Sequence, residues 1–336
     1  MPYMLSDKLV VGITSRALFD LAEEDALFRE RGLKVYRRHQ RDREHIPLRP
    51  GTAFPLIQGL LAINDRTDEP LVEVIVISRN DADSGTRIMN SVAHHALAIT
   101  RAAFTDGSEP WPYVEAFGCS LFLSAEHTDV EQALREGFPA ALISSPPPEQ
   151  PLESPPSEVR IAFDGDAVLF DPQSEQIYAE QGLAAFTERE AELSDHPMGP
   201  GPFEPFLRSL RQIQERFGTR NPPIRTALVT ARGAPAHRRV VNTLRAWGVR
   251  VDESFFLGGV DKTGVLEVFR PHIFFDDQTV HLERAAASTP GARVVPAGSR
   301  QLQLFGEATD QPIPAEEPVA GPGADEEPEA STRPRG

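Results

Sequence analysis

Two aspartates separated by one glycine, Asp164-Gly165-Asp166, follow directly after the apolar stretch 159–163. That stretch predicts a buried β-strand. Two carboxylates at the end of a buried strand are costly unless their charge is compensated, and an oxygen-rich site of this kind suits magnesium. Gly165 lets the chain turn sharply, so both acids can face one pocket. An ordinary Asp-Gly turn explains the same residues, so this stretch alone leaves both interpretations open.

Three later stretches extend the pattern in chain order. Thr230 stands at the end of a second predicted strand, Lys262 at the start of a predicted helix, and Asp276-Asp277 at the end of a third strand. Ligands in open α/β sheets bind outside the carboxyl ends of the strands. We therefore expect these side chains to gather at one edge of the sheet.

The order of these motifs resembles the haloacid-dehalogenase superfamily of aspartate-nucleophile phosphatases. A closer resemblance, over about residues 9–298, is to the cytosolic 5′-nucleotidase I family. The stretches that carry it are TSRALF at 14–19, PGTAFP at 50–55, FDGDAVLF at 163–170, LVTAR at 228–232 and RPHIFFDDQ at 270–278. The resemblance implies hydrolysis of nucleoside 5′-monophosphates to nucleoside and phosphate, through an aspartyl-phosphate intermediate and with magnesium as cofactor.

The resemblance also implies a role for each motif residue. Asp164 would be the nucleophile, and Asp166 would act first as general acid and then as base. The Thr230 hydroxyl would donate to a phosphate oxygen, and Lys262 would offset the charge of the phosphate and the acids. The implied magnesium ligands are Asp164, the backbone carbonyl of Asp166, and Asp276 or Asp277.

Several of these residues also have ordinary structural explanations. Thr230 could cap the helix that follows it, and Lys262 taken alone could be a solvated surface lysine. Arg232 could contact the substrate or pair with an acid, and the sequence does not decide between the two. Phe186 and Phe203 could stack on a base, although core packing suits either side chain better.

The composition excludes several classes of partner. The 336 residues include 50 acidic and 34 basic ones, which gives a formal net charge of −16. This charge argues against a nucleic-acid polymer or an anionic membrane as partner, although a local magnesium–Lys–Arg cluster still permits a small anionic substrate. The single cysteine, Cys119, rules out an intramolecular disulfide and suits a reducing compartment. With neither a signal peptide nor an apolar stretch of membrane-spanning length, the expected location is the cytoplasm.

The length of the chain suits two domains of ordinary size. A proline-rich stretch at 144–158 predicts a linker between an N-terminal unit at 1–143 and a catalytic unit at 159–306. Residues 307–336 are mostly Pro, Glu, Ala and Gly and predict a disordered acidic tail. The superfamily resemblance implies a small helical cap over the site, at about 173–200.

The two halves of the chain align with each other. At an offset of 150 residues, 14–19 match 164–169, and Pro50-Gly51 match Pro200-Gly201. At an offset of 152 residues, Ser78 matches Thr230, and 87–91 match 239–243. At an offset of 134 residues, 122–124 match 256–258. A shared rhythm of strands and helices does not explain matched Pro, Gly, Arg and Asn positions. We therefore predict an α/β fold of tandem Rossmann-like, haloacid-dehalogenase-like three-layer units, of which the N-terminal one is degenerate.

In the degenerate unit, Thr14 takes the place of the nucleophile and Arg16 that of the acid. Arg16, the hydroxyls of Thr14 and Ser15, and Ser78 at a second strand end suit a metal-free phosphate site. The resemblance implies a response to nucleoside di- and triphosphates, so Arg16 and Ser78 are candidates for binding a nucleotide effector. Arg16 could instead reach the neighbouring active site, or form a salt bridge in a unit that only packs.

The predicted function is thus that of a 5′-nucleotidase with a nucleoside monophosphate as substrate. One alternative is a phosphatase of the same chemistry that acts on another small phosphomonoester. The other is a nucleotide-sensing or scaffold protein, against which the intact motif positions argue. The sequence does not specify the base, the sugar or the oligomeric state, and a homo-oligomer stays open.

Overall fold

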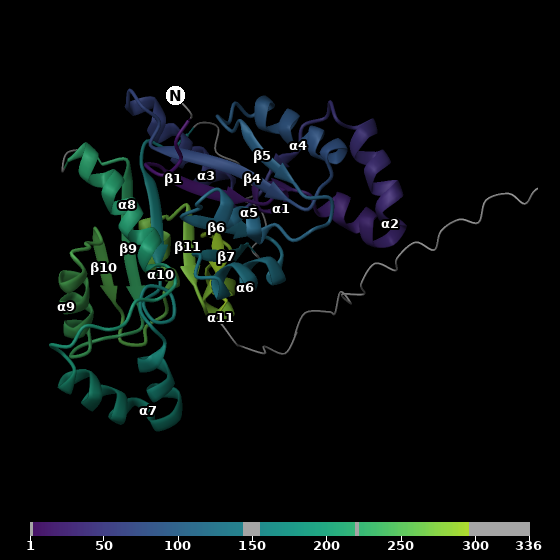
Figure 1. Cartoon of the computed structure of the whole chain (residues 1–336). Coiled ribbons are helices and arrows are strands. Elements are labelled where there is room, and N and C mark those ends of the chain that lie inside the picture. The colour runs from purple at the N-terminus through teal and green to yellow at the C-terminus, as the bar shows by residue number, and fades with distance from the viewer. Residues whose placement is uncertain (1–2, 144–154, 219–221, 296–336) are drawn as a thin grey trace, which may run out of the picture. The chain divides into compact units, whose positions relative to one another are not determined.

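The computed structural model describes residues 3–143, 155–218 and 222–295. These residues fold as α/β structure, with one ten-stranded sheet and helices packed on it (Figure 1). The predicted α/β class is therefore confirmed. Most of the predicted linker at 144–158 and all of the predicted tail at 307–336 lie outside the described residues.

The sheet runs in the order β10-β9-β8-β11-β12-β7-β6-β1-β4-β5. In the N-terminal half the strands are β1 Leu9–Ile13, β4 Val72–Ser78, β5 Arg101–Phe104, β6 Leu121–Ser124 and β7 Ala140–Ile143. In the C-terminal half they are β8 Val159–Phe163, β9 Ile224–Thr230, β10 Glu253–Phe256, β11 Ile273–Asp276 and β12 Gly291–Arg293. Neighbouring strands are parallel, except that β7 and β12 pair antiparallel where the halves meet.

Each half therefore contributes five parallel strands, in the same order when counted outward from the β7–β12 pair.

A separate two-stranded ribbon pairs β2 Phe19–Asp20 with β3 Arg49–Pro50. The helices of the N-terminal half are α1 Ser15–Leu18, α2 Ala22–Asp42, α3 Phe54–Ala62, α4 Ala82–His94, α5 Trp111–Ala116 and α6 His127–Arg135, with a 3-10 turn at Ile63–Arg66. Those of the C-terminal half are α7 Gln173–Glu192, α8 Glu204–Phe217, α9 His237–Trp247, α10 Thr263–Phe269 and α11 Thr279–Ala285.

Helices cover both faces of the sheet, and the strands alternate between the two faces. In β1, Val11 belongs to a core cluster with Ile57 of α3, whereas Val10 belongs to another cluster with Val114 of α5. The C-terminal half has α8 and α9 in the first cluster, and α10 and α11 in a third. Burial on both faces explains why the strands read as continuous apolar stretches.

Two long helices, α2 and α7, are each kinked at a glycine. Gly32 in α2 has φ 75° and ψ 176°, and Gly182 in α7 has φ 80° and ψ −179°. Only glycine adopts this region readily, so the sequence fixes both kinks. Helix α7 lies beyond the ends of β9 and β10, at the lower edge of Figure 1, within the stretch predicted as a cap.

One predicted internal match is wrong. Strand β6, which contains residues 122–124, lies beside β1 near the middle of the sheet, whereas Phe256 belongs to β10 at one edge. By position in the sheet, residues 122–124 correspond to 274–276 of β11. Several strands end with apolar residues followed by a small residue. A match of only three residues of this kind therefore does not identify the corresponding strand.

A second match is shifted by one residue. Thr14 and Asp164 both donate a backbone hydrogen bond to the neighbouring strand, 2.9 Å and 2.8 Å long, which supports the offset of 150 there. Further on, Gly51 N donates to Leu18 O, and Gly201 N donates to Leu169 O. The two donors are 150 residues apart, whereas the two acceptors, Leu18 and Leu169, are 151 residues apart. The loop after Asp164 thus has one extra residue, and Arg16 has no unique counterpart in it.

Candidate active site

The strand order brings the first and last acid motifs together. Asp164 is the first residue after β8, and Asp276 is the last residue of β11, the strand that pairs with β8. On the other side of β8 lies β9, so the order reverses at β8, where α/β sheets form their ligand sites. Parallel pairing alone thus places two carboxylates from distant parts of the chain at one end of the sheet.

Lys262, at the N-terminal end of α10, joins these two carboxylates. Its Nζ lies 2.9 Å from Asp164 Oδ1 and 2.7 Å from Asp276 Oδ2. The Lys262 side chain is only 4% exposed, so the interpretation as a solvated surface lysine is wrong. A buried ammonium between two buried carboxylates is strongly held, because little water screens the charges.

The cluster shifts the pKa of each member. Burial raises the pKa of Asp164 to about 7, against the opposing charge of Lys262. Burial acts against the charge of Lys262, but the two carboxylates outweigh it and the pKa of the lysine is raised. Burial also opposes ionisation of Asp276, yet hydrogen bonding from His281 and the charge of Lys262 lower its pKa. Lys262 therefore forms ion pairs with both carboxylates, and the surroundings of Asp276 favour its ionised form.

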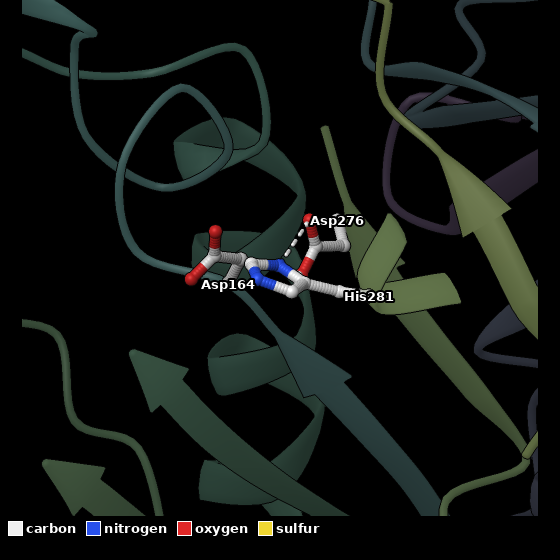
Figure 2. Close-up of side chains that lie close together, drawn as sticks. All are labelled: Asp164, Asp276 and His281. Atoms are coloured by element: carbon white, nitrogen blue, oxygen red, sulfur yellow. Dashed lines mark hydrogen bonds and ion pairs between the residues drawn. The ribbon is translucent and has the colours of Figure 1, made fainter. Parts of the chain in front are cut away.

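His281, in the first turn of α11, is a residue that the sequence analysis missed. Its Nδ1 lies 3.1 Å from Asp276 Oδ2. Ligand atoms of Asp164, Asp276 and His281 all lie within 4.8 Å of one another (Figure 2). The sequence contains a signal for this position, because a helix that starts just after a strand has its first turn close to the end of that strand. A histidine five residues after Asp276 is therefore expected near Asp276.

Asp277 lies buried beside this cluster. Its Oδ1 has no hydrogen-bond partner within the described part of the chain. Burial raises its pKa to about 8, and the charges of Asp164, Glu175 and Asp276 add to the shift. An orphaned carboxylate oxygen among surplus buried acids fits a hard divalent cation, which takes oxygen ligands.

Asp166, two residues after Asp164, has a different partner. Arg232 Nε lies 2.8 Å from Asp166 Oδ2, and Arg232 Nη2 lies 2.6 Å from Asp166 Oδ1. The side chain of Arg232 is buried, and two parallel bonds of this kind fix the orientation of the carboxylate. Of the two roles left open for Arg232, pairing with an acid is the one that the geometry supports.

Thr230 is the last residue of β9 and is buried. Its Oγ1 accepts a hydrogen bond of 3.2 Å from the backbone N–H of Arg232. Helix α9 begins later, with Ala236 as N-cap, so the capping explanation for Thr230 is wrong. A Cβ at Gly165 would lie 3.1 Å from Thr230 Oγ1, so the glycine lets the hydroxyl approach the loop that carries both acids.

The remaining candidates, Arg16 and Ser78, lie at the strand ends of the N-terminal half. Arg16 forms ion pairs with Asp25 at 3.1 Å and with Glu126 at 3.3 Å, both from the same half. Ser78 Oγ lies 2.9 Å from Ser15 Oγ and donates to Asn80 Oδ1 at 2.7 Å. This geometry matches the salt-bridged interpretation of Arg16.

Phe203 and Phe186, the aromatic candidates, differ in their surroundings. Phe203 is fully buried and packs against Phe163 and Phe275, which confirms core packing. Phe186, on α7, contacts Tyr178 and lies over the guanidinium of Arg232, with 5.4 Å between the ring centroid and Cζ.

Comparison with known proteins gives a consistent result. A family model described as 5′-nucleotidase matches residues 1–301. The chain is 35% identical over 288 residues to the human protein named cytosolic 5′-nucleotidase 1B. The aligned region covers 82% of this chain and 47% of the human protein. The chain thus spans about half the length of this curated relative. No solved structure matches it, and none of the described helices has the length and apolar character to cross a membrane.

Proposed function

The chain belongs to the 5′-nucleotidase family, and from this we propose that it hydrolyses nucleoside 5′-monophosphates to nucleoside and phosphate. The predicted resemblance to the cytosolic 5′-nucleotidase I family is confirmed by the same comparisons. The observation that carries the proposal is the buried cluster of Asp164, Lys262 and Asp276 at the ends of two paired strands. A cytoplasmic location is proposed on the name of the human relative.

Asp164 is the proposed nucleophile. A phosphate monoester is anionic and repels a carboxylate, so the attack needs positive charge close to both groups. Lys262 supplies it at 2.9 Å, in surroundings where little water weakens its field. The Asp164 oxygen forms a bond to phosphorus while the bond to the nucleoside oxygen breaks, which leaves an aspartyl-phosphate. Water then attacks this phosphorus and releases phosphate and the free carboxylate.

Asp166 and Thr230 are proposed to serve these two steps. Asp166 gives a proton to the departing nucleoside oxygen and later takes one from the attacking water. The proposed role of Thr230 is to donate a hydrogen bond to a phosphate oxygen, and the close approach of its Oγ1 to Gly165 supports this role. The pairing of β8 with β9 supports both roles, because Asp166 follows β8 and Thr230 ends β9.

Magnesium is the proposed cofactor. The residues that would hold it are Asp164, the backbone carbonyl of Asp166, and Asp276 or Asp277. The unpartnered Oδ1 of Asp277 favours that residue, because both oxygens of Asp276 already accept hydrogen bonds. When bound, the ion supplies positive charge to the nucleophile and the phosphate.

We also propose that the halves are duplicated haloacid-dehalogenase-like units, near 1–143 and 159–306, with α7 as the cap of the second. The shared strand order and the two kinks support this, and so do matching hydrogen bonds. The matching pairs are Arg87 Nε to Ile46 O with Arg239 Nε to His196 O, Leu48 N to Ser91 Oγ with Met198 N to Thr243 Oγ1, and Asn90 Nδ2 to Glu44 O with Asn242 Nδ2 to Ser194 O.

Phosphate release from a panel of substrates tests the proposal. The panel contains nucleoside 5′-monophosphates, the matching 3′-monophosphates and sugar phosphates, each with magnesium and with a chelator. We expect the highest kcat/KM with 5′-monophosphates and loss of turnover in chelator. A clear preference for sugar phosphates would favour a phosphatase of another small phosphomonoester. Tight nucleotide binding without any turnover would favour a sensing protein.

A further inference from the structure

Arg232 connects the proposed acid to helix α7. On one side its guanidinium makes the two bonds to Asp166, and on the other its Nη1 donates to Glu190 Oε2 at the end of α7. Glu190 is almost fully buried, and its Oε1 accepts from Arg239 Nη1 at 2.7 Å and from Ser174 Oγ at 2.8 Å. Both carboxylate oxygens of Glu190 therefore accept hydrogen bonds, and Glu190 holds Arg232 on the side opposite to Asp166.

The surroundings leave Arg232 little freedom. Its side chain is 2% exposed, and the ring of Phe186 covers the guanidinium. The fork of an arginine bonds a carboxylate in one plane, so a fixed guanidinium also fixes the Asp166 carboxylate. Two of the groups that fix it, Phe186 and Glu190, come from α7. The orientation of Asp166 thus depends on a helix outside the sheet.

In the N-terminal half, the residues that correspond to Phe186, Glu190 and Arg232 form a neutral set. Four residues after its kink, α2 has Tyr36 where α7 has Phe186, and eight residues after it Gln40 where α7 has Glu190. Two residues after the end of β4, Asn80 takes the place of Arg232 after β9. Within this neutral set, Asn80 Nδ2 donates to Tyr36 Oη at 2.8 Å, and Gln40 Nε2 donates to Tyr36 Oη at 2.9 Å. Arg87 Nη1 donates to Gln40 Oε1 at 2.8 Å and to the buried Glu24 at 2.7 Å, so the glutamate of this half stands where α7 has Ser174.

This comparison separates folding from chemistry. The neutral set holds a kinked helix against a sheet of the same strand order, with the glutamate of this half at position 24 instead, so the fold does not require an arginine after the strand. Buried ions are costly, and a neutral network of similar size often stabilises equally well. The charged set occurs in the half that has Asp166, and the neutral set in the half that has no acid at residues 14–19, directly after β1.

We infer that Arg232 is a positioning residue, which Glu190 and Phe186 of α7 hold in place so that it fixes the Asp166 carboxylate for proton transfer. This inference rests on the proposed function, in which Asp166 protonates the leaving oxygen. Arg232 touches neither substrate nor phosphate in this role. Helix α7 then does more than cover the site, because it sets the geometry of the proton donor.

Exchange of the charged set for the neutral one tests the inference. The variant carries Phe186→Tyr, Glu190→Gln and Arg232→Asn, together with Ser174→Glu, which gives Arg239 the carboxylate that Glu24 gives Arg87. Its Tm should stay within a few degrees of the wild type, because the N-terminal half uses this set. With a nucleoside 5′-monophosphate, kcat should fall about 10- to 100-fold while KM changes little, since general acid catalysis contributes about 10²–10⁴-fold. With the 5′-thio analogue, whose thiolate departs without a proton, the fall should be less than about threefold.

Three further variants make the outcome decisive. Arg232→Lys keeps the charge and loses the fork, so it should show the same selective loss even if the combined variant fails to fold. Tyr36→Phe disturbs the neutral network to a similar extent and should leave both substrates unaffected. Equal losses with both substrates, or no loss, would overturn the inference. Asp164→Asn tells the two claims apart, because retained turnover in that variant contradicts the proposed mechanism itself.

Discussion

Buried charge is unevenly balanced around Lys262. Asp164, Asp276 and Asp277 lie together at the end of β8 and β11, and Lys262 pairs with the first two alone. The raised pKa values of Asp164 and Asp277, about 7 and about 8, express the same imbalance. A group that costs free energy when ionised in the folded protein is stabilised by a bound cation.

Magnesium should therefore stabilise the protein. At pH 8, millimolar magnesium is expected to raise the Tm by about 1–2 °C for each kcal/mol of binding free energy. Asp277→Asn removes the carboxylate with the unpartnered oxygen, so the rise should be much smaller in that variant. Thermal unfolding followed with and without a chelator measures both. An equal rise in the two proteins would place the ion elsewhere.

Cys119 illustrates the opposite case, a titratable side chain without a chemical role. It is buried in the core beside β1, and burial raises its pKa to about 12. At pH 8 the thiolate fraction of Cys119 is therefore about 1000-fold lower than that of a thiol with the ordinary pKa of 9.0. The folded protein should react with thiol reagents far more slowly than the denatured chain, which should take up one label. Fast labelling of the native protein would show that the thiol is accessible.

Strand ends were predictable from the sequence, and helix orientations were not. Thr230 and Asp276 were recognised because an apolar stretch ends where a polar residue begins. His281 and Glu190 were missed because they come from helices, whose direction depends on packing over long distances. Helix α2 was missed altogether, since its charged sequence buries only Glu24 and Gln40 and so shows no apolar face.

The loop between α7 and α8 requires a glycine at position 201. A Cβ there would lie 2.5 Å from Val168 O and 2.6 Å from Phe170 O, which are backbone atoms in the loop that follows Asp166. Gly51 has the same close approach in the N-terminal half, 2.9 Å from Leu18 O. At both positions the backbone has to move before a side chain fits.

Both alanine variants are therefore expected to lose about 1–3 kcal/mol of unfolding free energy, the usual cost of overpacking. Gly201→Ala should in addition lower kcat of the folded fraction, because it displaces the loop that carries Asp166. Gly51→Ala is the matched control and should leave kcat nearly unchanged. Denaturation midpoints and turnover at 25 °C measure the two effects. Wild-type stability in both variants would mean that the loops relax freely.

The two halves of the chain share a pattern that the sequence partly contains. An offset near 150 was visible in the Pro-Gly and Arg-x-x-Asn positions, and the hydrogen bonds of Arg87 and Arg239 follow it. The alignment failed at residues 122–124, where a three-residue match competed with strand order. The antiparallel pairing of β7 with β12 was not predictable, because it depends on how the complete sheets meet.

The difference between the halves is chemical rather than architectural. Where the C-terminal half has Asp164, Asp276 and Arg232, the N-terminal half has Thr14, Ser124 and Asn80 at the same places in the sheet. The polar groups of the N-terminal half bond one another, as Ser15, Ser78 and Asn80 do. A single set of acids at one end of the ten-stranded sheet is therefore expected to account for all turnover.

Phosphate release by Asp164→Asn tests this expectation most directly. The substitution keeps the size of the side chain and removes the attacking charge, so the far-ultraviolet circular dichroism and the Tm should remain close to those of the wild type. With magnesium and a nucleoside 5′-monophosphate, we expect release to fall to the background rate. Release near the wild-type rate from the folded variant would contradict Asp164 as the nucleophile and the account of the active site built on it.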